Sequence, residues 1–102
     1  MVKIQEISSD KNIIKNEKID FFKCYLVGNK IMVSVGIFGD TIINNNEILI
    51  KFPFVAKTSY RLQIKSSSLL AYIDEGNNCF KVETYNNIKI ESYSVLNFEF
   101  YI

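Results

Sequence analysis

Few residues of this chain have the type and spacing that catalysis or metal binding requires. The 102 residues include no histidine, which removes the commonest general base, the usual partner of a nucleophilic serine or cysteine, and most zinc sites. The adjacent carboxylates Asp74 and Glu75, in the segment DEGNN, could hydrolyse a glycosidic bond or bind calcium, but the ligand order of an EF-hand is missing. A solvated turn explains this segment better. We therefore predict a protein that is not an enzyme and needs no metal or cofactor.

The serines and cysteines have simpler explanations. The serines at 8–9 and 66–68 lie in no nucleophile motif and are typical of turns. Cys24 and Cys79 are too few for a disulfide framework. We expect two reduced thiols that act as small packing residues, in a chain made in the cytoplasm.

Composition and charge exclude several classes of protein. The hydrophobic fraction of 48% and the aromatic fraction of 14% indicate a folded β protein rather than a disordered one. The net charge of +1 gives no electrostatic reason to expect a nucleic acid or an anionic membrane as a partner. No segment has the apolar length of a signal peptide core or a membrane span, so no membrane insertion is expected.

The strongest structural signal is the stretch from Phe21 to Phe38, in which Gly28-Asn29 joins two strand-like runs. A Gly-Asn pair between alternating runs fits a two-residue hairpin turn. With this turn one face of the hairpin is wholly apolar, whereas a slip by one residue mixes the two faces. The predicted register pairs Val27 with Lys30, Leu26 with Ile31, Cys24 with Val33 and Phe22 with Val35.

Four further strands are expected in the middle of the chain. The run EILIKF places Ile48, Ile50 and Phe52 on one face before Pro53 ends it. The run SYRLQIKS alternates apolar and polar residues and turns back at Ser67-Ser68, and a loop at 75–78 turns the chain again. In the hairpin that turns at Ser67-Ser68, the expected pairs are Leu62 with Ile73 and Ile64 with Ala71. In the hairpin that turns at 75–78, they are Ile73 with Phe80 and Ala71 with Val82.

The C-terminal part adds a longer connection and a last strand. A tight hairpin at Asn86-Asn87 would turn Glu91 and Lys89 toward the core, so residues 86–92 are interpreted as a longer connection. The run YSVLNFEFYI alternates again, with Ile102 facing inward. We predict an all-β fold, an antiparallel β-sandwich or barrel of about seven short strands over residues 19–102, preceded by an arm or linker at 1–18.

The alternation also predicts which side chains are buried. The inward residues are Phe22, Cys24, Leu26, Ile31, Val33, Val35, Leu62, Ile64, Val82, Leu96, Phe98 and Phe100. More apolar residues remain outside than a small monomer usually exposes, which predicts self-association. These are Met32, Phe38, Leu49, Leu70 and Val95.

Tyrosines on polar faces or near loops are the best binding candidates. A flat amphipathic ring can stack on a sugar or anchor a protein contact, although cross-strand packing is a competing explanation. These tyrosines are Tyr25, Tyr72, Tyr85, Tyr93 and Tyr101.

The pattern Y-x-V-G-N-x-I-x-V-S-V at 25–35, the step from an apolar strand into Pro53, and the C-terminal LNFEFYI together resemble the head domains of phage tail-fibre and baseplate receptor-binding proteins. The resemblance covers roughly residues 19–102. It implies a homotrimer of β-sandwiches that binds a host cell-wall saccharide, is made in the cytoplasm of the host bacterium, and joins other tail proteins in the virion tail.

Two alternatives stay open. The same fold could serve a small virion structural or assembly protein that makes only protein contacts. A depolymerase fragment that cleaves glycans with Asp74 or Glu75 is the third hypothesis.

Strand parity predicts where a saccharide would bind. In an up-and-down succession the loops at 28–29, 53–58 and 75–78 lie at one end with the C-terminus, and the N-terminal arm lies at the other. If the arm leads to a tail shaft, the first end faces the host. The predicted ligand-binding residues are Asn29, Lys57, Thr58, Tyr72, Asp74, Glu75, Asn77 and Asn78.

Overall fold

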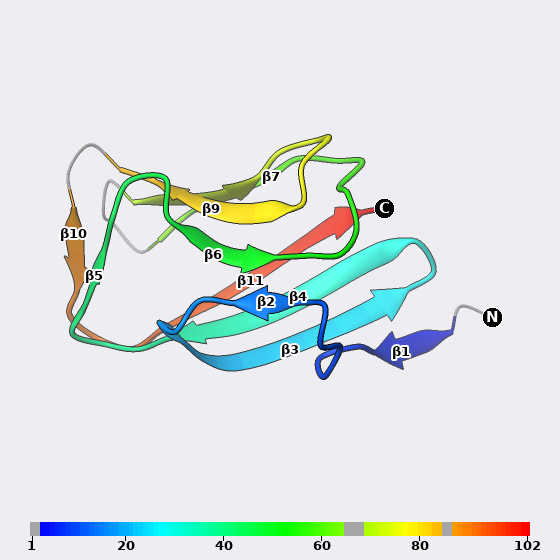
Figure 1. Cartoon of the computed structure of the whole chain (residues 1–102), viewed down its shortest axis with the longest axis horizontal. Helices are drawn as coiled ribbons and strands as arrows, with labels where there is room; N and C mark the ends of the chain where they lie inside the picture. The colour runs from blue at the N-terminus through cyan, green and yellow to red at the C-terminus, as the bar shows by residue number, and fades with distance from the viewer. Residues whose placement is uncertain (1–2, 65–68, 85–86) are drawn as a thin grey trace.

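The computed structural model describes residues 3–64, 69–84 and 87–102, and every regular element in these ranges is a β-strand (Figure 1). The all-β prediction is therefore confirmed. The strands are β1 (Ile4–Glu6), β2 (Ile14–Lys15), β3 (Ile19–Val27), β4 (Lys30–Ile37), β5 (Thr41–Ile43), β6 (Ile48–Lys51), β7 (Tyr60–Gln63), β8 (Leu70–Ile73), β9 (Cys79–Glu83), β10 (Ile88–Ile90) and β11 (Ser94–Tyr101). None of the described elements is a helix long and apolar enough to cross a membrane.

The described residues form eleven strands, more than the predicted number of about seven. The elements that were not predicted are the shortest ones, β1, β2, β5 and β10, with two or three residues each. A run of this length is too short to show a period of two, so alternation cannot reveal it.

The strands form two large sheets and one small one, and all pairs are antiparallel. One sheet has the order β1-β3-β4-β11, and the other has the order β2-β6-β9-β8-β7. The two large sheets lie over each other, and the pair β10-β5 lies at one end (Figure 1). This is a sandwich whose core lies between the sheets, as the buried residues of both sheets show.

The first hairpin has the predicted register. β3 pairs with β4 through Phe22 and Val35, Cys24 and Val33, Leu26 and Ile31, and Val27 and Lys30. Gly28 adopts a φ of 65° at the first central position of the turn, which glycine tolerates without steric cost.

The predicted core is confirmed. Each residue predicted to face inward, apart from Ile48 of β6, is either buried or packed against the buried cluster. The exposed fraction falls to 3% for Phe98, whereas its neighbour Val95 on the other face of β11 is 56% exposed. Met32 and Phe38 are exposed as predicted, and Leu70 is half-buried.

The register of the β7–β8 hairpin was predicted wrongly by two residues. Leu62 pairs with Ala71 rather than with Ile73, and the backbone amide of Ile64 donates to the carbonyl of Leu69. A shift by two residues keeps the same side chains on the same face, so the apolar pattern could not distinguish the two registers. The predicted turn at Ser67-Ser68 lies outside the described residues. The β8–β9 pairing of Ala71 with Val82 is confirmed.

β6 contains a second correction. The register of β6 against β9 shifts between Ile48 and Ile50, so Leu49 and Ile50 are both buried while Ile48 is exposed. The predictions that Ile48 shares the inner face and that Leu49 lies outside are therefore wrong. A bulge adds one residue to one strand and reverses the facing of side chains beyond it.

The N-terminal segment, expected to be an arm or linker, contributes strands to both large sheets. β1 pairs with β3, β2 pairs with β6, and Ile13 between them is 3% exposed. Ile4 lies opposite Val27, next to the turn of the first hairpin. The segment therefore begins at the end that also holds the C-terminus (Figure 1), and the predicted position at the opposite end is wrong.

The connection before β11 contains an element of its own. β10 pairs with β5, with Ile88 opposite Ile43 and Ile90 opposite Thr41. This pairing places Lys89 on the outside, where its ammonium lies 2.7 Å from Asp40. The residues Tyr85 and Asn86 lie outside the described part of the chain.

Candidate functional site

The structure brings the predicted binding loops together at one end of the sandwich. The amide of Ala56 donates to the carbonyl of Asn77, and the amide of Gly76 donates to the carbonyl of Ala56. The amide of Ile102 donates to the carbonyl of Asn29, so the hairpin turn and the C-terminus join the same end. Figure 1 shows this clustering of loops beside the C-terminus.

Several of the predicted ligand-binding groups already bind other parts of the protein. The Asp74 carboxylate accepts from the Arg61 guanidinium at 3.1 Å, and this guanidinium covers the Tyr72 ring at 4.9 Å from its centroid. The Asn78 side-chain amide donates to the carbonyl of Phe52 at 3.0 Å, and the Thr58 hydroxyl accepts from the backbone amide of Tyr101. These contacts connect the loops to the two sheets.

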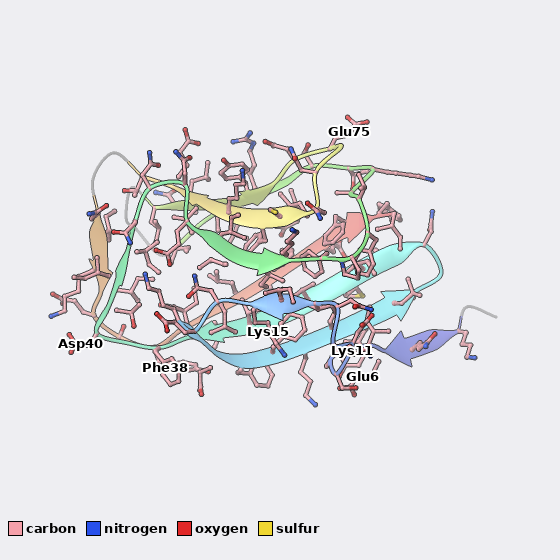
Figure 2. All side chains as sticks on the ribbon, in the orientation of Figure 1. Glu6, Lys11, Lys15, Phe38, Asp40 and Glu75 are labelled. Carbon is pink, nitrogen blue, oxygen red and sulfur yellow. The ribbon has the colours of Figure 1, made fainter. Side chains whose placement is uncertain are left out.

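Besides Thr58, four predicted residues are exposed at this end: Asn29, Lys57, Glu75 and Asn77. The Glu75 side chain points away from the sandwich (Figure 2). Because the N-terminal segment begins at the same end, the geometric reason for assigning this end to the host is removed.

A second candidate lies on the outer face of the β1-β3-β4-β11 sheet. A hollow of about 390 Å³ opens there and reaches the free edge of β11. Its lining residues come from β3, β4, β11 and β7, and they are Tyr25, Met32, Val33, Ser34, Tyr60, Asn97, Phe98 and Glu99.

Strand pairing explains the layout of this hollow. Tyr25, Met32 and Glu99 lie side by side in one row across three strands. Ser34 and Asn97 form the next row, two residues along. Because alternate residues of a strand face the same side, both rows point away from the core. Tyr60 of the opposite sheet completes the hollow, and its ring packs at 6.5 Å from the Phe98 ring.

The charges around the hollow are paired. Lys30 lies 3.4 Å from Glu99, and Lys23 lies 3.4 Å from Glu6 on the same face. Hydrogen bonds from Ser8 and Lys23 lower the pKa of the Glu6 carboxyl below its usual value of 4.5, so this carboxylate stays ionised at neutral pH. Around the hollow, opposite charges therefore occur in equal number.

The hollow has the composition of a binding site. Two tyrosine rings and a methionine provide apolar walls, while Ser34, Asn97 and Glu99 provide hydrogen-bonding groups. Within residues 3–64, 69–84 and 87–102, no three His, Cys, Asp or Glu side chains gather as a metal site. Burial and then the Asp10 charge raise the pKa of the Cys24 thiol to about 12, which keeps this buried sulfur protonated.

The hollow was missed by sequence reasoning although parts of its signal were present. The alternation of apolar and polar residues in the sequence places Tyr25, Ser34, Asn97 and Glu99 on outward faces. The order of the strands in the sheet could not be predicted, because nothing local in the sequence shows that the last strand pairs with β4 rather than with another edge strand. Tyr60 shares the inward face of the alternating run with Leu62 and Ile64, and it packs against the core while it also reaches the rim of the hollow from the other sheet.

No protein-family model matches the chain, and neither a curated protein nor a solved structure is significantly similar to it.

Proposed function

We propose that this protein is a non-enzymatic receptor-binding head domain of a phage tail, which recognises a bacterial surface saccharide in the hollow on its four-stranded sheet. The observation that carries the proposal is the grouping of Tyr25, Met32 and Tyr60 with Ser34 and Asn97 in one open hollow.

The chemistry of a sugar ring fits these groups. One face of a hexose carries mainly C–H bonds and stacks on an aromatic ring, while its hydroxyls need donors and acceptors at the rim. The Asn97 amide can both donate and accept, and the Ser34 hydroxyl does the same. The resemblance to phage head domains points to a sugar on the host surface.

The first test replaces two side chains that line the hollow and leaves the buried core unchanged. We expect Tyr25→Ala combined with Asn97→Ala to weaken binding to the preferred polysaccharide at least about tenfold, because a tenfold change needs only about 1.4 kcal/mol. The measurement is binding of wild type and variant to an array of purified bacterial surface polysaccharides, followed by titration against the best one.

The matched control substitutes exposed residues in the loops beside the C-terminus, where the sequence predicts saccharide binding. Lys57→Ala, Glu75→Ala and Asn77→Ala together leave the contacts of the loops intact, because their side chains have no hydrogen-bond or ion-pair partner among the described residues. Unchanged binding is expected. Loss of binding in this control alone would return the site to the loops, and a wild type that binds no polysaccharide would refute the saccharide function.

The proposal includes self-association as a homotrimer. Apolar side chains outside the hollow remain exposed, and contact between copies is the simplest way to cover them. They are Ile14, Phe38, Ile42, Ile48 and Val55. The Phe38 side chain points outward near the β5 end (Figure 2).

We expect sedimentation equilibrium at micromolar concentration to give the mass of a trimer. A monomer at this concentration would contradict the homotrimer and leave the hollow to be judged by the array.

The same exposed residues favour a second candidate, a small virion assembly protein that uses this fold for protein contacts. The two candidates differ in one result. An assembly protein would form an oligomer but bind no polysaccharide on the array.

A further inference from the structure

We propose that the ligand is an uncharged, linear glycan that lies along the strands and spans both the hollow and a second platform, made by Tyr93 over Gly36. This inference rests on the proposed saccharide function and specifies its ligand.

The platform is built by the absence of a side chain at Gly36. A Cβ at this position would overlap the Tyr93 hydroxyl and would lie 2.5 Å from the ring carbon Cζ. The ring therefore lies against the backbone of β4, on the outer face of the sheet. It is still 45% exposed, so its other side faces the solvent.

The Asp20 carboxylate lies near the Tyr93 hydroxyl. Partial desolvation and then the interaction with this carboxylate raise the pKa of the Tyr93 hydroxyl above its usual value of 10. The hydroxyl therefore stays protonated at physiological pH. Phe21 and Val95, which pair with Gly36 from the neighbouring strands, are exposed on either side of the platform.

The platform and the hollow share one face and follow the same strand. Gly36, Ser34 and Met32 are alternate residues of β4, so they form three successive rows. Gly36 lies four residue steps from Met32, which corresponds to about 13 Å along an extended strand. A single sugar in the hollow cannot also cover Tyr93. A chain of sugars that runs along β4 meets an aromatic group at each end and the polar pair Ser34 and Asn97 between them.

The charge of the face indicates a neutral polymer. Its two lysines are already joined to glutamates, as Lys23 with Glu6 and Lys30 with Glu99, and the Asp20 carboxylate beside Tyr93 adds a negative charge. An anionic polymer would have to break one of these pairs to reach a lysine. A neutral glycan leaves both pairs in place.

The test uses chains of different length and charge. The probes are size fractions of the preferred neutral polysaccharide, from the single sugar to long oligomers, and a ribitol-phosphate teichoic acid as the anionic polymer. We expect affinity to rise with chain length up to a plateau, with little change on addition of salt, and weak binding of the teichoic acid.

Tyr93→Ala should weaken binding of long oligomers at least about tenfold, which is the size of effect expected when an aromatic ring that stacks on a ligand is removed. The affinity for the shortest ligands should not change. Tyr93→Phe should retain most of the affinity because the ring remains. The matched control is Tyr101→Ala, at the C-terminal end of β11 on the same face with 43% exposure, beyond the far side of the hollow. It should leave binding unchanged.

Each outcome decides between the hypotheses. Three results would overturn the inference that the ligand is a linear neutral glycan, while the hollow could still bind sugar. They are equal affinity of Tyr93→Ala and wild type for long oligomers, an affinity that does not depend on chain length, and salt-sensitive binding of the anionic polymer. Absence of binding to every fraction would instead refute the proposed function. Dissociation of an oligomer by Tyr93→Ala would show that a second copy covers this face, and would also overturn the inference.

Discussion

Replacing Phe98 with alanine should lower the free energy of unfolding by about 3 to 5 kcal/mol. Phe98 is 3% exposed, and its ring stacks on the Phe80 ring with centroids 3.9 Å apart and planes at 8°. Phe52 and Tyr60 contact it from other directions at 6.4 and 6.5 Å. Phe98 belongs to one large sheet, whereas these three residues belong to or flank the other.

The size of the effect follows from this position between layers. Alanine removes the transfer free energy of the ring and leaves a cavity that neither sheet can close without moving against its own hydrogen bonds. Equilibrium unfolding in urea measures the change. Tyr60 also lines the hollow, so partial loss of saccharide binding is expected in the same variant.

The control for this prediction lies on the same strand. Val95→Ala should change the free energy of unfolding by less than about 0.5 kcal/mol, because Val95 is exposed on the outer face. If both variants lost the same stability, the assignment of inner and outer faces to β11 would be wrong.

The alternation that identifies Phe98 as buried is the part of the fold that the sequence predicts best. Long strands such as β3, β4 and β11 show a period of two over eight or nine residues, and the Gly28 turn determines the register of the first pair. These signals are local, so no knowledge of other strands is needed.

Other features depend on distant partners and were not predictable from local pattern. The bulge at Ile48 and Ile50 is set by pairing with β9, and the four residues between Ile64 and Leu69 allow two registers with the same faces. β1 and β2 are too short to alternate and become strands only because β3 and β6 offer free edges.

The candidate site shows the same division. The outward direction of Tyr25 and Asn97 follows from alternation, but their meeting in one hollow requires that β11 pair with β4. Tyr93 was identified as a surface tyrosine, yet its platform depends on Gly36, which comes from another strand. Pairwise contacts between distant strands therefore make the site, and the sequence alone carries only its components.

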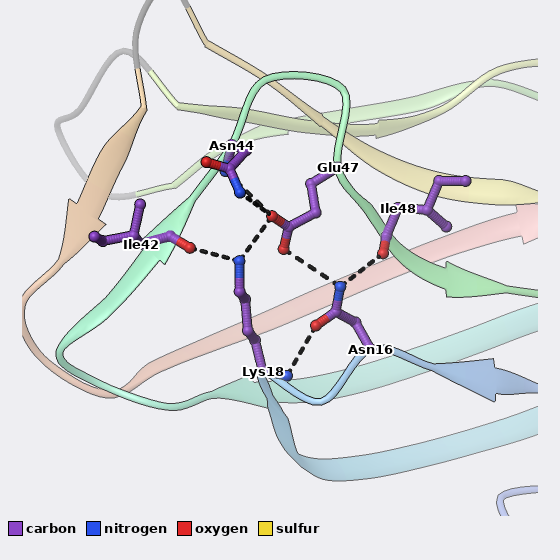
Figure 3. A network of polar contacts seen from close by, with 6 residues as sticks. All are labelled: Asn16, Lys18, Ile42, Asn44, Glu47 and Ile48. Atoms are coloured by element: carbon purple, nitrogen blue, oxygen red, sulfur yellow. Dashed lines mark hydrogen bonds and ion pairs between the residues drawn. The ribbon is translucent and has the colours of Figure 1, made fainter.

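A polar cluster at the end opposite to the termini should make the protein sensitive to acid. Glu47 accepts from the Lys18 ammonium at 2.7 Å, and its other carboxylate oxygen accepts from the Asn16 amide at 3.3 Å (Figure 3). The backbone amide and the side chain of Asn44 donate to the same carboxylate. Lys18 also donates to the carbonyl of Ile42, so the cluster joins the N-terminal segment to the β5–β6 connection.

The sign of the pH effect follows from the pKa of Glu47. Burial by itself raises this pKa, but the hydrogen bonds and charge of Lys18 together with the Asn44 contacts outweigh it, and the pKa lies below the usual 4.5. A lowered pKa in the folded state stabilises the protein above the unfolded value. The contribution is therefore complete above about pH 4.5 to 5 and is lost as the pH falls through the folded pKa.

Glu47→Gln tests this linkage. At pH 7 the variant should lose about 1 to 3 kcal/mol of unfolding free energy, because Lys18 keeps a largely buried ammonium without its carboxylate. Below the folded pKa, where wild-type Glu47 is itself protonated, the difference between the two proteins should shrink. Urea unfolding of both proteins across acidic and neutral pH measures it. The control Glu75→Gln changes an exposed carboxylate and should leave the profile unaltered. A difference between wild type and Glu47→Gln that stays constant from neutral to strongly acidic pH would show that packing, rather than the ionised carboxylate, accounts for the effect.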